Sequence, residues 1–378
     1  MTSVRVCQLT LTSFRNYERA SLLLPATGAA LLGDNGHGKT NLLEAIYYLE
    51  LFRSARGARD KDLVRFGDAG FHVSATLENS PRGALSVSAG FDATTQKKKV
   101  SIDSVEVTRL SDAIGAAPAV LFSPADVALV RGAPAERRRF LDVMLALADR
   151  RYLLALQRYR HALAQRNAAL RSMNGQPRDA ESMDAVEAFE PALAAAGAIM
   201  LLKRHQWALE AAPAYAEVLG AIGERTSVAL SLKRGGGARV DEGELAEWLR
   251  TTLAAQRTHD ARRGTTHTGP HRDELQLLLD GRDLRSFGSN GQQRSAAIAL
   301  RMLEARTLQS ALGTAPLLLL DDPFAELDAD RSARILGLLG SRGLGQVVLA
   351  VPRAEDIPRA LTGLHTVRVH HGTLAPDS

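Results

Sequence analysis

Hydrophobic and polar positions alternate along much of the first third of the chain. Apolar residues recur at every second position, the spacing of a strand with one buried face, in segments 9–11, 22–24, 71–77, 85–91 and 100–102. Residues 29–32 are a short apolar run, and Leu42, Ile46 and Leu49 within residues 40–52 are spaced as on one face of a helix. Gly, Pro and Asn separate the later segments, which favours antiparallel hairpins. Roughly the first 125 residues therefore predict strands around one helix.

The pattern becomes helical near Pro134. Residues 136–170 contain no Gly or Pro and carry a heptad-like apolar stripe, made of Tyr152, Leu156, Tyr159, Leu163 and Leu170. After an interrupting loop at 171–184, apolar residues recur every seven positions, at Val186, Leu193, Met200 and Trp207. Pro191 must then lie in a first helical turn or bend the helix. We expect two antiparallel helices packed on each other, with these stripes as their core and not as a ligand site.

Strand patterns resume after about residue 226. Residues 275–279 alternate into an Asp280–Gly281 turn, which is typical of a hairpin. A helix is expected at 292–312, ended by Gly313, and another near 329–340, with buried parallel strands at 317–320 and 346–350. The prediction is an α/β head with a mixed sheet, formed by residues 1–125 and 226–378. Residues 126–225 would be an inserted helical subdomain with a short helical hairpin.

A candidate phosphate-binding loop joins the apolar run at 29–32 to the first helix. It fits the pattern G-x-x-x-x-G-K-[ST] through Gly33, Asp34, Asn35, Gly36, His37, Gly38, Lys39 and Thr40. Glycines let successive backbone N–H groups turn toward one anion, and the helix start adds its positive dipole end. A strand before the motif and a helix after it are the context that supports a P-loop for ATP. Lys39 would then reach the β and γ phosphates, and the Thr40 hydroxyl would bind Mg²⁺.

Two acidic residues follow the apolar strand at 317–320. Asp321 ends that strand as a Walker B aspartate does and is the second candidate ligand for Mg²⁺. Asp322 is placed to act as general base for an attacking water. The alternative for this pair is a solvated turn before Pro323, which becomes less favoured once a P-loop is present.

A third motif lies one helix upstream of Asp321. Ser289, Gly291 and Gln292 match the S-x-G-Q signature of ABC ATPases, and AELD at 325–328 occupies the place of their D-loop. In that class the signature closes on the γ-phosphate held by a second molecule, so that ATP joins two heads. Taken alone, the segment could equally be a helix start with serine as N-cap.

The order and spacing of these motifs resemble SMC-type heads (structural maintenance of chromosomes). About 250 residues separate P-loop and signature, and such heads place a coiled coil in that gap. The chain resembles the RecF family of bacterial replication-repair ATPases over almost its whole length. The segments that carry this resemblance are LTSFRNYE, GDNGHGKTNLLEAIYYL, LFSPADVALVRGAPAERRRFLD, TGPHRDEL, FGSNGQQRS and LLLLDDPFAELD.

The resemblance implies a function in recombinational repair and replication restart. It implies an ATP-dependent homodimer that binds single- and double-stranded DNA at gap junctions and helps load RecA together with RecO and RecR. It also implies that Arg15 of the FRNY segment approaches the nucleotide. His271 and Arg272 match the family, without a role that the sequence defines.

Hydrolysis of ATP is expected to be slow. Asp322 is one methylene shorter than the glutamate usual in fast ABC ATPases. Val351 stands where that class often has a histidine and where the RecF family has small hydroxyl residues. Since a well-placed base contributes roughly 10²–10⁴-fold, we expect a weak, DNA-stimulated ATPase that works as a switch.

Composition changes this picture little. The formal net charge of +5 is compatible with a polyanionic partner, and no zinc-ligand spacing or Ser/His/Asp set is recognisable. Three observations favour a cytoplasmic protein. The chain has a single cysteine, Cys7, its first residues do not form a signal peptide, and no run of about 20 apolar residues is present. The candidate contacts to DNA phosphates are Arg53, Arg56, Arg59, Lys61, Lys97–Lys99 and Arg137–Arg139.

Two other functions remain possible at this level. An ATPase subunit of a membrane transporter would share the three motifs, but the long split and the lack of a recognisable Q-loop argue against it. A small-molecule kinase would use the P-loop alone and would leave the signature unexplained.

Overall fold

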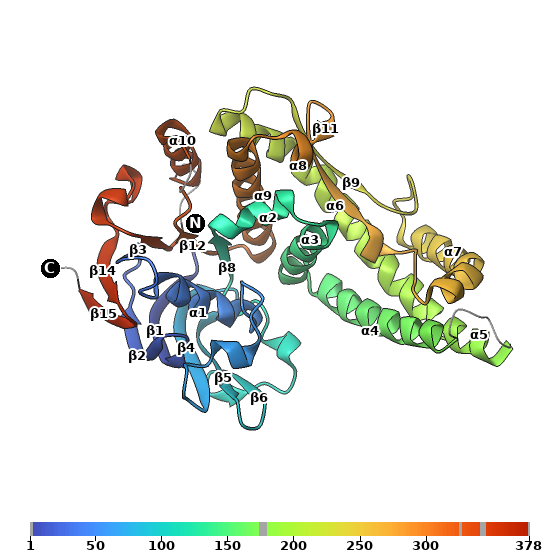
Figure 1. Ribbon diagram of the computed structural model, residues 1–378, viewed down its shortest axis with the longest axis horizontal. Helices are drawn as coiled ribbons and strands as arrows, with labels where there is room; N and C mark the ends of the chain where they lie inside the picture. Colours follow the sequence, from blue (N-terminus) through green and yellow to red (C-terminus); the bar gives the residue numbers. More distant parts are fainter. Residues whose placement is uncertain (1–2, 174–179, 325–326, 341–344, 377–378) are drawn as a thin grey trace. The chain divides into compact units, whose positions relative to one another are not determined.

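The computed structural model describes residues 3–173, 180–324, 327–340 and 345–376 (Figure 1). The chain divides into two compact units. The first, here called the sheet unit, comprises Met1–Val127, Gly220–Glu224 and Arg294–Ser378. The second, the helical unit, comprises Ala128–Leu219 and Arg225–Gln293.

The sheet unit contains an antiparallel sheet built from the N-terminal third of the chain. Its strand order is β2-β1-β4-β5-β6-β7. The strands are β1 (Arg5–Phe14), β2 (Tyr17–Leu23), β4 (Gly70–Ser80), β5 (Gly83–Asp92), β6 (Lys97–Ile102) and β7 (Val105–Glu106). Buried and exposed residues alternate along β4, as the sequence pattern predicts for a sheet with one face toward the core.

A second sheet of this unit brings both ends of the chain together, in the order β15-β14-β3-β13-β12-β8. All neighbours run parallel except β14 and β15, which form a hairpin. The strands are β3 (Gly28–Leu32), β8 (Ala119–Phe122), β12 (Leu317–Asp321), β13 (Val347–Val351), β14 (His365–His370) and β15 (Thr373–Pro376). β3 and β13 are buried along their whole length, because a parallel sheet is covered on both faces.

Helix α1 (Lys39–Leu51) packs against strands of both sheets, so that nearly all of its residues are buried. The sheet unit also holds α10 (Ala329–Gly340) and residues 294–312 of α9 (Asn290–Leu312). Its 3₁₀ turns are Asp60–Leu63, Leu110–Asp112, Pro124–Val127, Ala354–Asp356 and Arg359–Leu361.

The helical unit contains a small antiparallel sheet of order β11-β10-β9. Its helices are α2 (Ala128–Arg131), α3 (Pro134–Ala148), α4 (Arg150–Ser172), α5 (Ala180–Glu187), α6 (Glu190–Ile222, of which 190–219 lie here), α7 (Glu242–Arg263) and α8 (Leu284–Phe287). The strands are β9 (Val228–Lys233), β10 (Glu274–Leu279) and β11 (Arg282–Asp283), and Pro270–Arg272 is a 3₁₀ turn. The Asp280–Gly281 turn joins β10 to β11, as expected from the sequence.

Three expectations about this part of the chain were wrong. Residues 136–170 are two helices, because Asp149 leaves helical geometry and its carboxylate accepts the N–H groups of Arg151 and Tyr152. Helix α7 was missed, although Leu245, Leu249 and Leu253 recur every four residues and are buried. The helical unit also extends to residue 293, past the expected end at 225, because β9–β11 pair with one another and with neither large sheet.

Helix α6 has a length and composition that would also suit a membrane span. The segment Met183–Ile222, which contains α6, has a mean hydropathy of 1.6 over its most apolar window, so it is a membrane-span candidate by length and composition although it holds no unbroken run of about 20 apolar residues. Half of that window is buried inside the protein. Pro191 lies in the first turn of α6, which is one of the two expected alternatives, and Arg204 in its middle is buried with ionic partners. These features are those of the central helix of a folded unit.

Candidate nucleotide site

The loop between β3 and α1 has the backbone of a phosphate-binding loop. Gly33, Gly36 and Gly38 have φ values of 150°, 85° and 117°, which residues with a side chain rarely adopt. A Cβ on Gly38 would lie 2.7 Å from the Asn16 amide, so this position also lacks room for one. Among the described residues, no side chain caps the start of α1 and its first turn is free of acidic residues. Its N–H groups are therefore available to an anion.

A cavity of about 350 Å³ lies beside this loop within the sheet unit. Its lining residues are Asn35, Gly36, Gly38, Lys39, Thr40, Asn41, Arg56, Pro124, Asp321, Asp322, Ala350 and Pro352. The volume lies at the lower end of the range for small-molecule sites, which is roughly 300–1,000 Å³. Cationic groups and carboxylates line the same cavity, as a magnesium–phosphate ligand requires.

Thr40 and Asp321 are 281 positions apart in sequence and meet in this cavity. The Thr40 hydroxyl donates to Asp321 Oδ1 at 2.9 Å. The two residues predicted as magnesium ligands are therefore adjacent, one from the start of α1 and one from the end of β12. Lys39 donates to the carbonyl oxygens of Gly33 and, at 3.0 Å, Asp34, which places its ammonium inside the loop.

Burial disfavours the charged forms of the groups in this cavity. It lowers the pKa of Lys39, against the opposing effect of Asp321, Asp322 and Asp34. It raises the pKa of Asp321, although the Thr40 hydrogen bond and nearby Arg56 favour the carboxylate. The pKa of Asp322 is raised as well, first by burial and then by Asp356. Perturbed groups that converge on one cavity are typical of functional sites.

Asp322 also has an unusual backbone. Its φ of 43° is in the left-handed region, which is uncommon for a residue other than glycine. Its N–H donates to the carbonyl oxygen of Ala350 at 3.0 Å, and Arg294 donates to the carbonyl oxygen of Pro323 at 3.3 Å. These contacts hold the turn after β12 so that Asp322 lines the cavity.

A buried carboxylate, Glu44, holds two arginines next to the loop. Arg15 Nε and Nη2 donate to its two oxygens at 3.0 and 3.2 Å, and Arg56 and Ser54 also donate to it. Burial raises the pKa of Glu44, but the hydrogen bonds from Arg56, Arg15 and Ser54 outweigh burial, and the net pKa is lowered. Arg56 lines the cavity, whereas Arg15 is not among the described lining residues. The role of Arg15 in nucleotide binding stays a prediction.

The signature segment caps its own helix. Ser289 Oγ accepts the N–H of Gln292 at 3.3 Å, and Gln292 Oε1 accepts the N–H of Ser289 at 2.9 Å. This reciprocal pair is a capping box. Ser289 is exposed, and with Gly291 and Gln292 it belongs to the helical unit, whereas the P-loop belongs to the sheet unit. Of the expected D-loop at 325–328, Ala325 and Glu326 lie outside the described residues.

Several basic residues considered for DNA have partners inside the protein. Lys98 pairs with Asp60 at 2.7 Å, Arg59 with Asp62 at 3.0 Å, Lys99 with Glu106 at 3.5 Å, and the buried Arg137 with Glu274. Residues 97–99 begin β6 and are not the tip of a hairpin, because the preceding turn occupies 93–96. Lys61, Lys97 and Arg139 are exposed.

A network of buried charges and hydrogen bonds in the helical unit gives residues of the TGPHRDEL segment a structural role. Arg204 donates to Asp142 and Asp273, both at 2.7 Å, and to the carbonyl oxygen of Pro270 at 2.6 Å. His271 Nε2 lies 2.9 Å from the carbonyl oxygen of Thr266 and is therefore the protonated nitrogen, so its Nδ1 accepts from Tyr159 at 2.6 Å. These contacts give His271 a structural role. Sequence reasoning missed Arg204, whose only signal is a charge among the apolar residues of α6.

Comparisons with known proteins agree with this arrangement. Residues 5–373 match the family model described as the RecF/RecN/SMC N terminal domain. The DNA replication and repair protein RecF of Chloroflexus aurantiacus is 38% identical, and the alignment covers 97% of this chain and 98% of that protein. The chain belongs to the RecF family. The RecF of Geobacillus thermodenitrificans is 33% identical over 98% of this chain and 99% of its own length.

Solved structures extend the similarity to the fold. The structure of the recombination mediator protein RecF-ATP in the RecFOR pathway is similar with a TM-score of 0.90 and 26% identity, covering 100% of this chain and 98% of that one. An Smc head domain from Pyrococcus furiosus is similar with a TM-score of 0.58 and 17% identity, over 98% and 95% of the two chains. The predicted SMC-like ABC ATPase head is thereby confirmed for this RecF family member.

Proposed function

We propose that the protein is an ATP-switched DNA-binding protein of replication and recombinational repair that acts in the cytoplasm. The observation that carries this proposal is the contact between Thr40 and Asp321 beside Lys39, in a cavity below an uncapped helix start. ATP would place its phosphates on the N–H groups of the loop and on Lys39. Mg²⁺ would be held by Thr40 and Asp321, which offer the oxygen ligands that this ion prefers. The relatives support the wider role through their names.

ATP would join two copies of the chain. Ser289 is exposed at the start of α9 and is free to meet the triphosphate of a second copy. The residues assigned to this contact are Ser289, Gly291 and Gln292. Asp322 would orient the attacking water. Val351, which is buried in β13 and ends that strand, offers no hydrogen bond to the γ-phosphate, so hydrolysis would be slow and would release the dimer.

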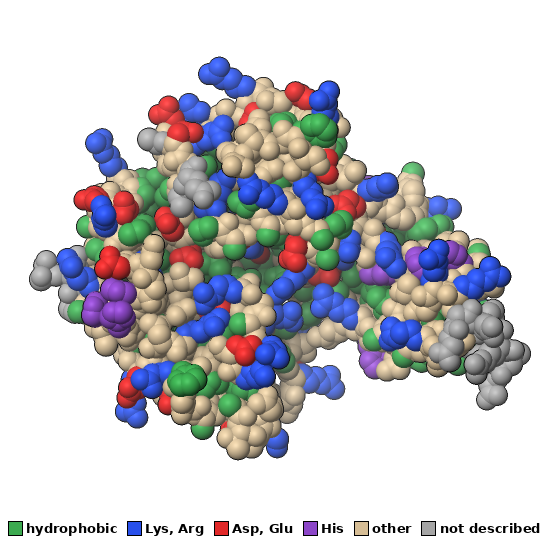
Figure 2. Space-filling view, viewed as in Figure 1, with side chains coloured by type: hydrophobic (Ala, Val, Ile, Leu, Met, Phe, Trp, Pro, Cys, Tyr) green, Lys and Arg blue, Asp and Glu red, His purple; other side chains and the backbone are tan. Residues whose placement is uncertain are grey.

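DNA would bind through its phosphates to exposed basic side chains such as Lys61, Lys97 and Arg139. In Figure 2, Lys and Arg side chains are spread over the visible face with Asp and Glu among them. Contacts of this kind give an affinity that falls steeply with salt. Binding at single-strand/double-strand junctions, and work with RecO and RecR in loading RecA, complete the proposal. Similarity over the whole chain to a recombination mediator of the RecFOR pathway supports this assignment.

The experiment measures the size of the protein by analytical ultracentrifugation, alone and with ATP, ADP or gapped DNA. ATP should produce a dimer and ADP should not. Lys39→Ala should lose both ATP binding and pairing. Ser289→Arg should still bind ATP but stay monomeric, whereas Ser286→Arg, at an exposed serine of the neighbouring helix α8, should pair normally.

A Ser289→Arg variant that still pairs with ATP would overturn the proposed contact across the dimer. Normal ATP affinity in Lys39→Ala would overturn the nucleotide site itself. ATP turnover measured with and without gapped DNA tests the function: stimulation supports the DNA switch, and indifference to DNA would favour the transporter or kinase alternative.

A further inference from the structure

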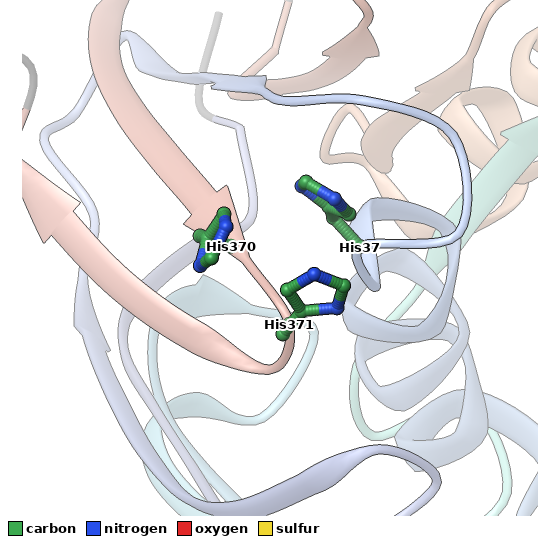
Figure 3. A group of neighbouring side chains, drawn as sticks. All are labelled: His37, His370 and His371. Carbon is green, nitrogen blue, oxygen red and sulfur yellow. The ribbon is translucent and has the colours of Figure 1, made fainter.

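Three histidines gather on the surface of the sheet unit, on the outer side of the phosphate-binding loop. His37 comes from the loop, His370 is the last residue of β14, and His371 lies in the turn that joins β14 to β15 (Figure 3). The ring centroids are 4.9, 4.3 and 4.5 Å apart for the three pairs. One ring nitrogen of each histidine lies within 4.8 Å of the others.

The loop that carries His37 and the hairpin that carries His370 and His371 are held together by hydrogen bonds that do not involve the imidazole rings. The N–H of Gly372 donates to the carbonyl oxygen of His37 at 3.0 Å, and Asn16 Nδ2 donates to the same oxygen at 3.0 Å. A Cβ on Gly372 would lie 2.3 Å from the Asn16 carbonyl oxygen, which shows how closely the turn approaches. β14 also pairs in parallel with β3, the strand that leads into the loop. The three imidazoles therefore need only side-chain rotation to converge.

The side chain of His37 is not part of the phosphate cavity. Asn35, Gly36 and Gly38 line that cavity, and His37 between them is not among its described lining residues. His37 is half-buried, while His370 and His371 are exposed. Histidine side chains are visible at the surface on the left of Figure 2, where Figure 1 shows β14 and β15. An ion in solution can thus reach the group without entering the nucleotide site.

We propose that His37, His370 and His371 bind a divalent transition-metal ion of the zinc class. Neutral imidazole is a preferred ligand of Zn²⁺, Ni²⁺ and Cu²⁺, and three such ligands leave a fourth position for water. Zinc–nitrogen bonds of about 2.1 Å require ligand nitrogens roughly 3.4 Å apart in a tetrahedral site. Rotation of the two exposed rings closes the remaining gap. A bound ion would cross-link the phosphate loop to the C-terminal hairpin.

The test uses the full-length protein without an affinity tag and without nucleotide, so it is independent of the proposed ATP function. Co²⁺ is titrated as a spectroscopic probe, and Zn²⁺ is then added to displace it. We expect one Co²⁺ per chain, visible absorption bands of a tetrahedral nitrogen-ligated ion, and loss of these bands with Zn²⁺. Mg²⁺, which prefers oxygen ligands, should not displace Co²⁺.

Variants locate the site. His37→Asn and the double variant His370→Gln/His371→Gln should each weaken Co²⁺ binding at least tenfold and abolish the bands. His365→Gln, at an exposed position of the same strand β14, should bind as the unchanged protein does. His259→Gln controls for a second histidine pair, His259 and His267, whose rings are 5.0 Å apart in the helical unit.

A second measurement does not depend on cobalt spectroscopy. Zn²⁺ should raise the thermal unfolding midpoint of the unchanged protein and of His365→Gln, but not that of the double variant, with circular dichroism showing that all three are folded. Equal binding of Co²⁺ by the unchanged protein and the double variant would overturn the proposal. So would bands that survive in the double variant and vanish in His259→Gln.

Discussion

Two buried sites of this protein, the Arg204 network of the helical unit and the candidate nucleotide cavity of the sheet unit, use buried charge in different ways. In the helical unit, Arg204 is 1% exposed and donates to two carboxylates, a carbonyl oxygen and the Tyr152 hydroxyl. Burial lowers the pKa of Arg204, but Tyr152, Asp142 and Asp273 outweigh it, so the arginine is firmly charged. At its partner Asp273 burial is the larger effect and raises the pKa to about 6, against the opposing effect of Arg204. In the candidate nucleotide cavity of the sheet unit, the effect of burial is larger than that of the neighbouring charges. The pKa of Lys39 is therefore lowered and that of Asp321 is raised.

The difference separates charges that serve the fold from charges that serve a ligand. A paired network stabilises the conformation in which its members meet, and removal of one member leaves the others buried without compensation. The charges of the cavity compensate one another only in part, which suits a site whose ligand brings charges of its own. Removing a member of the Arg204 network should therefore destabilise the protein, whereas removing a charge from the cavity should leave its stability almost unchanged.

The largest effect is expected for Arg204→Met. The change leaves Asp142 and Asp273 buried without their shared cation, which should lower the free energy of unfolding by about 3–5 kcal/mol. Urea denaturation followed by circular dichroism measures this loss. The matched control is Arg160→Gln, because the side chain of Arg160 also pairs with Asp142 but is 53% exposed. It should cost no more than about 1 kcal/mol. Equal losses in the free energy of unfolding for the two variants would show that the buried ion pairs of Arg204 stabilise the protein no more than the exposed pair of Arg160 does.

A smaller effect, which depends on pH, is expected from His271. Burial lowers its pKa to about 4, helped by Arg272 and Arg138 and opposed by the Thr266 carbonyl oxygen and Asp260. Between about pH 6.5 and 4 the unfolded chain binds a proton at this residue that the folded protein does not, so stability is lost as pH falls. The loss attributable to His271 should approach about 3 kcal/mol at pH 4 and vanish above pH 7.

The variant His271→Gln tests whether the buried, neutral His271 causes this loss of stability in acid. Its stability, measured by urea denaturation from pH 4 to 8, should fall less steeply with acid than that of the unchanged protein. His161→Gln, at an exposed position of α4, should follow the unchanged protein over the whole range. Parallel curves for all three proteins would mean that His271 can be protonated in the folded state.

The smallest effect, and one of opposite sign, is expected for Asp321→Asn. An asparagine can keep the hydrogen bond from Thr40 while removing a carboxylate whose pKa burial raises, so the protein without nucleotide should be slightly more stable near pH 8. Binding of ATP in the presence of Mg²⁺ should weaken strongly at the same time, as calorimetry would show. A clear loss of stability would mean that Asp321 is a structural partner, like those of Arg204.

The sequence largely predicted which residues meet in the candidate cavity, because two local patterns, a glycine-rich loop before a helix and an acidic residue after an apolar strand, mark them. Gly33 and Gly38 mark the loop. Asp321 follows a strand whose residues are all apolar, a pattern that predicts a buried strand. The placement of Arg56 in the cavity was not predictable, since it depends on Glu44, a buried acid in the middle of α1. Nothing in a one-dimensional pattern distinguishes that acid from a solvated one.

The division of the chain could be predicted only in part. The boundary near residue 126 follows from a change of periodicity, and the structure divides the chain after Val127. The second boundary was misplaced because alternation predicts a strand without indicating its neighbours, and β9–β11 pair among themselves. The histidine group could not be predicted at all, because no sequence motif links His37 to His370 and His371, as the P-loop and Walker B motifs link Thr40 to Asp321.

The position of β3 in the parallel sheet has a consequence for synthesis. Its neighbours on both sides, β13 and β14, come from the last few dozen residues, some 300 residues later in the chain. At about 5–20 residues per second, the ribosome needs roughly 15–60 s to make them. During that interval the strand that leads into the nucleotide loop has no sheet to join. A nascent chain that stalls before Val347 therefore exposes this apolar segment, and we expect it to be a substrate for chaperones.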